Sequence, residues 1–399
     1  MSRSLRILAL NPHHGGSHRA FLGGWIEHSQ HHFDVLTLPP YKWKWRMRHA
    51  PVTFSRELRE RLFNRKPEAC ASPRTPQAHA SGLRLNEDVG VAPCEWDVLF
   101  CTDMLNLAEF LGLCPPAVRD LPRIVYFHEN QLTYPNREDR ERDLHFAFSN
   151  ITTGLAADQV WFNSAFHRDE FLTAVDEWMR RMPDYQLLDA ADAIRGKSSV
   201  QPPGLPLLPG EGLRLRDPSI PIRIVWVSRW EHDKDPDTFF AALRELKDRG
   251  EHFRLNVLGE SFGDVPAVFE DARLEFAQQI DHWGYATSRE EYQAVLANSD
   301  VVVSTAKHEF FGIGVLEAVT SGCFPLVPRA LAYPEVLGDH SDFFHDGTAT
   351  GIADRLCELF QRLSQTGTCW SNDEARSRIM ERHRWSSRAE AMDREVELA

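Results

Sequence analysis

Two glutamates eight residues apart carry the strongest chemical signal in the chain. Glu309 follows an apolar run at residues 301–303, and Glu317 lies in a helical pattern that begins near Gly312 and Gly314. A helix that starts at such glycines directs backbone N–H groups and its positive dipole end toward a phosphate. Carboxylates at this spacing along a helix lie about 12 Å apart, close to the separation of the hexose and ribose of a nucleotide sugar. The alternative is a helix start with two exposed glutamates.

Two cations follow a strand that we expect at residues 222–227. Breaking a sugar–phosphate bond leaves negative charge on the diphosphate, and fixed cations such as Arg229 and Lys234 stabilise that charge. Taken alone, an Arg and a Lys in a loop are more often solvated surface charges. Asp235 and Asp237 superficially spell the D-x-D metal motif, but helix capping and the preference for acidic residues in a first turn explain them. No metal is therefore expected.

Polar residues also gather where strands of the first half are expected to end. A strand at residues 5–10 leads into a histidine- and glycine-rich loop, whose paired glycines allow a ligand to approach the backbone closely. A tight turn is the alternative, and a histidine metal site lacks the accompanying Cys or carboxylate ligands. A second polar loop follows the strand expected at residues 124–127. The candidates in these loops are His14, Gly15, Gly16, His18, His128, Glu129, Asn130 and Gln131.

One basic segment stands out in an acidic chain. The net charge is −13, yet residues 41–84 hold eleven Lys and Arg against three Glu. Cations interleaved with aromatic rings can neutralise phosphates and stack on exposed bases of single-stranded RNA. The alternative is an amphipathic edge whose tryptophans pack inward. The residues concerned are Lys42, Trp43, Lys44, Trp45, Arg46 and Arg48.

Length and composition favour a large cytoplasmic enzyme. A chain of 399 residues is expected to form two or more domains. No run approaches 18 apolar residues, and the apolar stretch at residues 7–10 is too short for a signal peptide. Seven cysteines without a C-x-x-C pair indicate reduced thiols, with Cys101 and Cys323 buried in the core.

Strands and helices alternate along the chain, which predicts an α/β fold with doubly wound parallel sheets. Asp235 and Pro236 are typical of a helix start. We expect residues 72–82 to be a disordered loop. The predicted organisation is an N-terminal Rossmann-like acceptor-binding domain at 1–205 with an insertion at about 41–95, a linker at 206–220, a C-terminal nucleotide-sugar-binding domain at 221–380, and a C-terminal helix at 381–399.

These motifs resemble known families. Glu309 and Glu317 match the E-x7-E signature of retaining glycosyltransferases of the GT-B architecture, and residues 312–318 are similar to their F-G-x-x-x-L-E-A motif. The resemblance implies two Rossmann-like domains facing across a cleft, with the C-terminal helix packed back on the N-terminal domain. Residues 15–18, the segment 38–48 and the segment 127–135 resemble the tRNA-queuosine mannosyltransferase family.

The resemblance implies retaining transfer of mannose from GDP-mannose to the cyclopentenediol of queuosine at the tRNA wobble position. His128 would lie beside the reacting sugar carbon, Glu309 would hold hexose hydroxyls, and Glu317 would bind the ribose. Other acceptor contacts would come from His14, His18, the basic segment and residues 129–131. Further donor contacts would come from Gly284 and Tyr285 in a loop expected at residues 282–285, and from Gly15, Gly16, Arg229, Lys234, Gly312, Ile313, Gly314 and Val315.

Two alternatives stay open at this level. The enzyme could use another nucleotide sugar and a glycan, lipid or other modified nucleoside as acceptor. A non-catalytic RNA-binding protein on a degenerate GT-B fold is the second alternative. Beyond the nucleotide sugar and tRNA, the sequence predicts no cofactor, no membrane association and no obligate protein partner.

Overall fold

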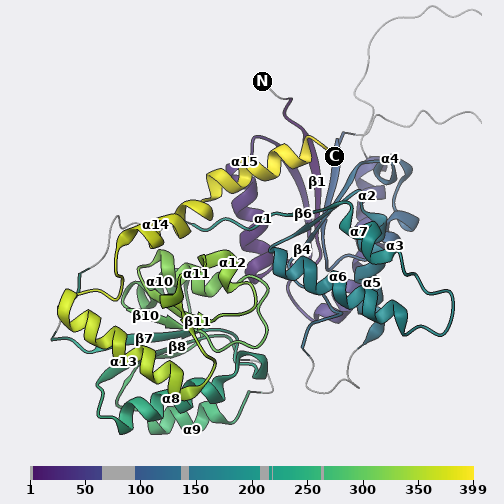
Figure 1. Cartoon of the computed structure of the whole chain (residues 1–399). Coiled ribbons are helices and arrows are strands. Elements are labelled where there is room, and N and C mark those ends of the chain that lie inside the picture. Colours follow the sequence, from purple (N-terminus) through teal and green to yellow (C-terminus); the bar gives the residue numbers. More distant parts are fainter. Residues whose placement is uncertain (1–2, 65–94, 136–142, 207–214, 218, 262–264) are drawn as a thin grey trace, which may run out of the picture.

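The computed structural model describes residues 3–64, 95–135, 143–206, 215–217, 219–261 and 265–399, which form two α/β units (Figure 1). The loop predicted at residues 72–82 and most of the predicted linker at 206–220 lie outside the described residues. Within the described ranges, no helix combines the length and apolarity needed to cross a membrane.

The first unit is built on a six-stranded parallel sheet with the order β2-β1-β3-β4-β5-β6. Its central strands are buried on both faces, as expected where helices cover both sides of a parallel sheet. The strands are β1 (Arg6–Asn11), β2 (His32–Thr37), β3 (Val98–Thr102), β4 (Arg123–Phe127), β5 (Gln159–Phe162) and β6 (Ser198–Val200). The helices are α1 (Gly16–His28), α2 (Trp43–Asn64), α3 (Leu107–Leu113), α4 (Pro116–Arg119), α5 (Leu144–Ala156), α6 (Ala165–Arg180) and α7 (Ala190–Arg195).

The second unit repeats this plan with the strand order β12-β11-β10-β7-β8-β9, again parallel throughout. The predicted parallel α/β fold is therefore confirmed. The strands are β7 (Ile222–Val227), β8 (Phe253–Leu258), β9 (Ile280–Gly284), β10 (Val301–Val303), β11 (Phe324–Pro328) and β12 (Phe344–His345). The helices are α8 (Pro236–Asp248), α9 (Val268–Glu275), α10 (Arg289–Ala297), α11 (Ile313–Thr320), α12 (Tyr333–Leu337), α13 (Ala349–Thr366), α14 (Asp373–Arg382) and α15 (Trp385–Val396), with 3-10 turns at His232–Lys234 and Ser341–Phe343.

Two local expectations were wrong. Residues 282–285 were expected to form a loop, but His282 and Trp283 belong to the edge strand β9, where Trp283 packs against Trp230 at a ring separation of 5.5 Å. The 12 Å estimate for the two glutamates assumed a continuous helix. Glu309 instead lies in the loop four residues before α11 begins, so only Glu317 is helical.

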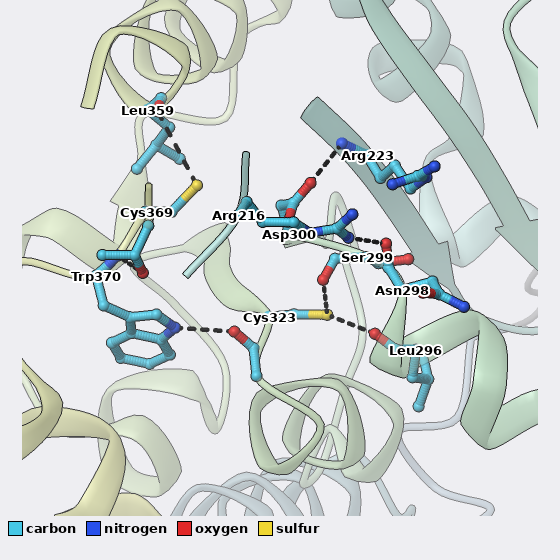
Figure 2. Close-up of polar contacts among 12 residues, drawn as sticks. Arg216, Arg223, Leu296, Asn298, Ser299, Asp300, Cys323, Leu359, Cys369 and Trp370 are labelled. Carbon is cyan, nitrogen blue, oxygen red and sulfur yellow. Dashed lines mark hydrogen bonds and ion pairs between the residues drawn. The ribbon is translucent and has the colours of Figure 1, made fainter. Parts of the chain in front are cut away.

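Buried polar contacts fix the start of β10 and the chain that precedes the second unit (Figure 2). The Asp300 carboxylate accepts a hydrogen bond from the Arg223 backbone N–H (2.8 Å) and pairs with Arg216 (2.7 Å). Cys323 donates its S–H to two backbone carbonyls in the same cluster. Cys323 and Cys101 are both fully buried, which confirms their predicted burial in the core.

The C-terminal helices cross from the second unit to the first, where α15 lies beside α1 (Figure 1). Trp385 lies directly on the backbone of Gly24, where an added Cβ would come within 2.1 Å of the indole. Asp393 accepts hydrogen bonds from the Trp25 indole (2.9 Å), the Ser29 hydroxyl (2.7 Å) and a backbone N–H (2.8 Å). The prediction that a C-terminal helix packs back on the N-terminal unit is therefore confirmed.

We expect Asp393→Ala to lower the free energy of unfolding by about 3 kcal/mol, because it leaves buried donors without an acceptor. Urea unfolding followed by tryptophan fluorescence measures the change. The matched control is Glu390→Ala on the same helix, where an exposed carboxylate pairs with Arg394 and its loss should cost under about 0.5 kcal/mol. Equal effects of the two substitutions would contradict the role assigned to Asp393.

Candidate active site

Loops at the carboxyl ends of strands from both units meet in one region, as expected for ligand sites in parallel α/β sheets. The Ser164 hydroxyl, after β5, donates to the Phe310 carbonyl in the loop after β10 (2.6 Å). His167 stacks on the Phe310 ring at a centroid distance of 3.8 Å. The Glu335 carboxylate accepts hydrogen bonds from the first N–H groups of α6 (2.8 and 3.1 Å). The two units are therefore held together beside the candidate site.

Lys234 is a buried cation at the centre of the second unit's loops, with 6% of its surface exposed. Its ammonium donates to the His308 carbonyl (2.6 Å) and pairs with Asp233 (3.1 Å) and Glu309 (3.4 Å). Burial lowers the pKa of Lys234, but the two carboxylates outweigh burial and the pKa is raised. The side chain therefore stays protonated.

Glu309 closes the loop that precedes α11. Its carboxylate accepts hydrogen bonds from the backbone N–H groups of Gly312 (3.0 Å) and Phe311 (3.4 Å). Burial raises the pKa of Glu309, but Lys234 and these N–H groups outweigh burial and lower it. Lys234 and Glu309 thus hold each other in ionised form, and the ion pair links the loops after β7 and β10.

The backbone geometry at the start of α11 favours glycine at both Gly312 and Gly314. Gly312 has a left-handed backbone (φ 82°), and an added Cβ would lie 2.8 Å from the Tyr333 ring. At Gly314 a Cβ would lie 3.0 Å from Val227, so glycine lets the helix approach the end of β7. The first N–H groups of a helix have no partner within it. An anion could therefore meet those of Ile313, Gly314 and Val315.

Glu317 lies one turn further along α11 and faces α10. Its carboxylate accepts hydrogen bonds from Arg289 (2.6 Å) and the Tyr292 hydroxyl (2.8 Å). Gly284, at the end of β9, accepts a hydrogen bond from the Gly259 backbone N–H (3.2 Å), and the following Tyr285 is 69% exposed. Residue spacing alone gave no signal for the two α10 partners of Glu317.

Arg229 reaches across the junction between the units. Its guanidinium donates to the Tyr134 hydroxyl of the first unit (2.6 Å) and pairs with Glu231 (3.4 Å). Burial raises the pKa of Glu129, a first-unit carboxyl whose electrostatic partner is Arg229. The Tyr134 ring also lies edge-on to His308 at 5.7 Å. Tyr134 had no role assigned from sequence, since nothing in its spacing revealed a partner 95 residues away.

Three histidines gather where β1 and β4 end. The rings of His18 and His128 lie 3.9 Å apart, and His13 lies 5.6 Å from His18. The His128 backbone N–H donates to Asp103 (3.0 Å). Burial lowers the pKa of His128 to about 3 and that of His18 well below its usual value, so both rings are neutral near pH 7. Among the described residues, Nε2 of His128 is buried and has no hydrogen-bond partner.

The predicted residues around this cluster serve different purposes. Gly15 precedes α1, where a Cβ would clash with Pro40 at 2.4 Å, and Gly16 has a positive φ of 47°. His14 contacts Asn11 through its ring (3.2 Å). Asn130 is fully buried, and its amide oxygen accepts two backbone N–H groups of the following turn. The Asn130 side chain therefore shapes this loop from within.

The basic segment from Trp43 onward forms the first turns of α2, and Lys42 directly precedes this helix. The inward-packing alternative holds for part of the segment. Trp43 packs against Phe146 at 5.2 Å, and Arg48 lies over the same ring at 4.9 Å. Trp45 is 60% exposed. Arg46 donates to a backbone carbonyl and to His49 (2.7 Å). Lys42, Lys44, Trp45 and Arg48 are thus the exposed members of the segment. Gln131 is buried.

The two halves of the chain match two described families. Residues 6–66 and 75–205 match the family described as tRNA-queuosine alpha-mannosyltransferase N-terminal. Residues 216–363 match the glycosyl transferases group 1 family. The fold and the matched catalytic half define a glycosyltransferase of the GT-B class.

The chain is 34% identical over 340 residues to the tRNA-queuosine alpha-mannosyltransferase of Drosophila melanogaster, covering 83% of this chain and 81% of that protein. It therefore belongs to the tRNA-queuosine alpha-mannosyltransferase family. A GDP-mannose-dependent alpha-(1-6)-phosphatidylinositol dimannoside mannosyltransferase of Mycobacterium tuberculosis is 30% identical over 141 residues, 35% of this chain and 36% of that protein.

Solved structures share the fold at low identity. A sucrose-phosphate synthase from Thermosynechococcus elongatus has a TM-score of 0.66 at 14% identity, covering 98% of both chains. HepE from Anabaena, solved in complex with UDP, has a TM-score of 0.62 at 13% identity, covering 99% of this chain and 100% of that chain. These likenesses confirm the GT-B architecture.

We expect Tyr134→Phe to lower kcat/KM for glycosyl transfer about tenfold, because it removes a hydrogen bond that positions the charged Arg229. Steady-state kinetics measure the effect, and the unfolding temperature should stay within about 2 °C because the ring is retained. Tyr185→Phe is the matched control, since Tyr185 is 94% exposed. Kinetics of Tyr134→Phe equal to the control would contradict the role given to this contact.

Proposed function

We propose that this enzyme transfers mannose from GDP-mannose to the cyclopentenediol of queuosine at the wobble position of tRNA, with retention at the sugar carbon. The observation that carries the proposal is the cluster of Arg229, Lys234, Glu309 and the start of α11, held against the first unit by Tyr134. Such a cluster suits a diphosphate with a sugar attached.

The donor diphosphate lies between the Arg229 guanidinium and the N–H groups of Ile313, Gly314 and Val315. Fixed dipoles and cations stabilise the charge that develops on the leaving group without reorganising in the transition state. Lys234 adds positive charge and fixes Glu309, whose oxygens hold hexose hydroxyls. No metal ion takes part, because these groups carry the neutralising charge. Membership of a mannosyltransferase family and the GDP-mannose-dependent mycobacterial relative support the choice of donor.

Transfer proceeds on one face of the sugar. The bond between the sugar carbon and the phosphate oxygen breaks, and its electron pair stays on that oxygen. The acceptor hydroxyl forms the new bond to the same carbon and gives its proton to the departing phosphate oxygen. Neutral His128, at the end of β4, lies beside the reacting sugar carbon. Glu317, ordered by Arg289 and Tyr292, binds the ribose.

The acceptor assignment rests on the first unit. The matched family and the Drosophila relative both carry tRNA-queuosine in their names. The exposed cations and Trp45 at the start of α2 suit an RNA loop, because they combine phosphate neutralisation with base stacking. We propose a cytoplasmic reaction, in agreement with the free cysteines.

The direct test incubates the protein with queuosine-containing tRNA and a panel of GDP- and UDP-sugars. We expect mass spectrometry of the digested nucleosides to show one added hexose on queuosine with GDP-mannose. Glu309→Gln should lower kcat at least a hundredfold, because it removes charge beside the sugar and its partner Lys234. Exposed Glu358→Gln is the matched control.

Absence of a hexose adduct with every donor would refute the acceptor assignment. Transfer from a UDP-sugar alone would refute the donor assignment and leave the acceptor standing.

The basic segment gives a second test. We expect Lys42→Glu with Lys44→Glu to weaken tRNA binding and to make the plot of log affinity against log salt less steep by about 1 to 2, because two phosphate contacts are lost. Arg180→Glu with Arg181→Glu is the control, since it makes the same charge change on α6. The slopes are measured by filter binding at salt concentrations from about 50 to about 200 mM. Equal slopes for the two double variants would contradict RNA contact by the start of α2.

A further inference from the structure

A pocket of about 470 Å³ opens between α2, α3 and α5 in the first unit, within the usual size of small-ligand sites (about 300–1,000 Å³). Met47 and Phe146 form its apolar walls and are 2% and 1% exposed. Its polar edge includes Asn106, Glu109 and Ser149. Of its lining residues, only Arg48 has a role described above, as an RNA contact of the basic segment.

The pocket is one layer of residues away from His128. Met104 packs with Met47 and Phe146, and it directly follows Asp103, whose carboxylate holds the His128 backbone. Asn150, next to Ser149 on α5, donates to the Asp103 carbonyl (3.0 Å). Packing of Met104 and hydrogen bonds of Asp103 therefore connect the wall of the pocket to the loop that holds His128.

The groups around the pocket match an unstacked nucleobase. The Arg48 guanidinium is held in place by Asp143 (3.4 Å) and lies over the Phe146 ring at 4.9 Å. Its outer plane is exposed, and bases of single-stranded RNA stack on Arg planes. The Glu109 carboxylate is an acceptor for amino and ring N–H groups of a base. The Asn106 side-chain oxygen already accepts the Glu109 backbone N–H (3.1 Å), so a ligand would meet its NH₂ group.

We propose that this pocket binds one base of the RNA acceptor's loop, adjacent to the nucleotide that is modified at His128. The base carries an amino group (guanine, adenine or cytosine), because Glu109 accepts hydrogen bonds and uracil offers only one ring N–H and no NH₂ group. The inference rests on the proposed RNA acceptor and adds to it a site that reads sequence beside the modified nucleotide.

Charge favours this occupant over an apolar peptide segment. Exposed Lys44 and the exposed ring of Trp45 belong to the same first turns of α2 that supply Met47 and Arg48 to the pocket, and exposed Lys42 directly precedes α2. An RNA strand whose phosphates contact these cations would direct its bases toward the pocket between α2, α3 and α5.

The test uses a queuosine-containing anticodon stem-loop RNA in which each loop base in turn is made abasic or exchanged. Fluorescence anisotropy gives Kd, and nucleoside mass spectrometry gives the rate of transfer. For the wild-type protein, we expect one position where an abasic site weakens binding at least fivefold. At that position uracil should bind at least fivefold more weakly than an amino-bearing base.

Two variants locate the effect in the pocket. Glu109→Gln should bind RNAs with different bases at this position equally well. An abasic site there should still weaken its binding. Ser149→Phe, which fills the pocket, should lose the abasic effect altogether, with folding checked by thermal unfolding. Glu57→Gln removes the same charge from exposed α2 and should retain the wild-type preference.

The outcomes separate the two proposals. Base-specific binding that needs Glu109, without transfer to any RNA, would uphold the pocket and overturn the proposed reaction. Transfer without a base-specific position, or with the preference unchanged in Glu109→Gln, would overturn the pocket and uphold the reaction. Loss of RNA binding altogether would overturn both.

Discussion

The buried ion pair between Lys234 and Glu309 is the interaction on which the rest of the site depends. An ammonium with 6% of its surface exposed is tolerated only when carboxylates and carbonyls surround it, because an unpaired buried charge costs several kcal/mol. The pair joins the loops after β7 and β10, and Glu309 in turn closes the first turn of α11. One electrostatic contact therefore fixes a cation, a carboxylate and a helix end relative to one another.

Contacts between the units extend this order into the first unit. Glu335 reaches the start of α6, Phe310 stacks on His167, and Arg229 meets Tyr134. These contacts lie beside the candidate site. They connect the candidate donor-binding groups of the second unit to the first unit. Glu129, at the same junction, turns out to be an electrostatic partner of Arg229, although the sequence placed it only among acceptor contacts.

Local patterns predicted the fold well. The structure also brings the predicted Lys234, Glu309 and start of α11 together, because these residues follow neighbouring strands of one sheet. The left-handed Gly312 and the close approach of Gly314 to Val227 are direct consequences of the motif. Partners distant in sequence could not be predicted: Tyr134 for Arg229, Arg289 for Glu317, and the α3 and α5 walls beside the basic segment. Residues 282–283 were mistaken for a loop because an edge strand has little apolar alternation.

The indole of Trp385 on Gly24 has a consequence for how the protein is made. The core around Trp25, Phe100 and Trp161 includes Trp385, Ala389 and Met392, so it is complete only after α15 has been synthesised. At 5–20 residues per second, roughly 10–40 s separate translation of the first sheet from that of α15. During this interval the apolar side of α1 is exposed to solvent, because α15 does not yet cover it. We therefore expect chaperones to bind the N-terminal half of the nascent chain.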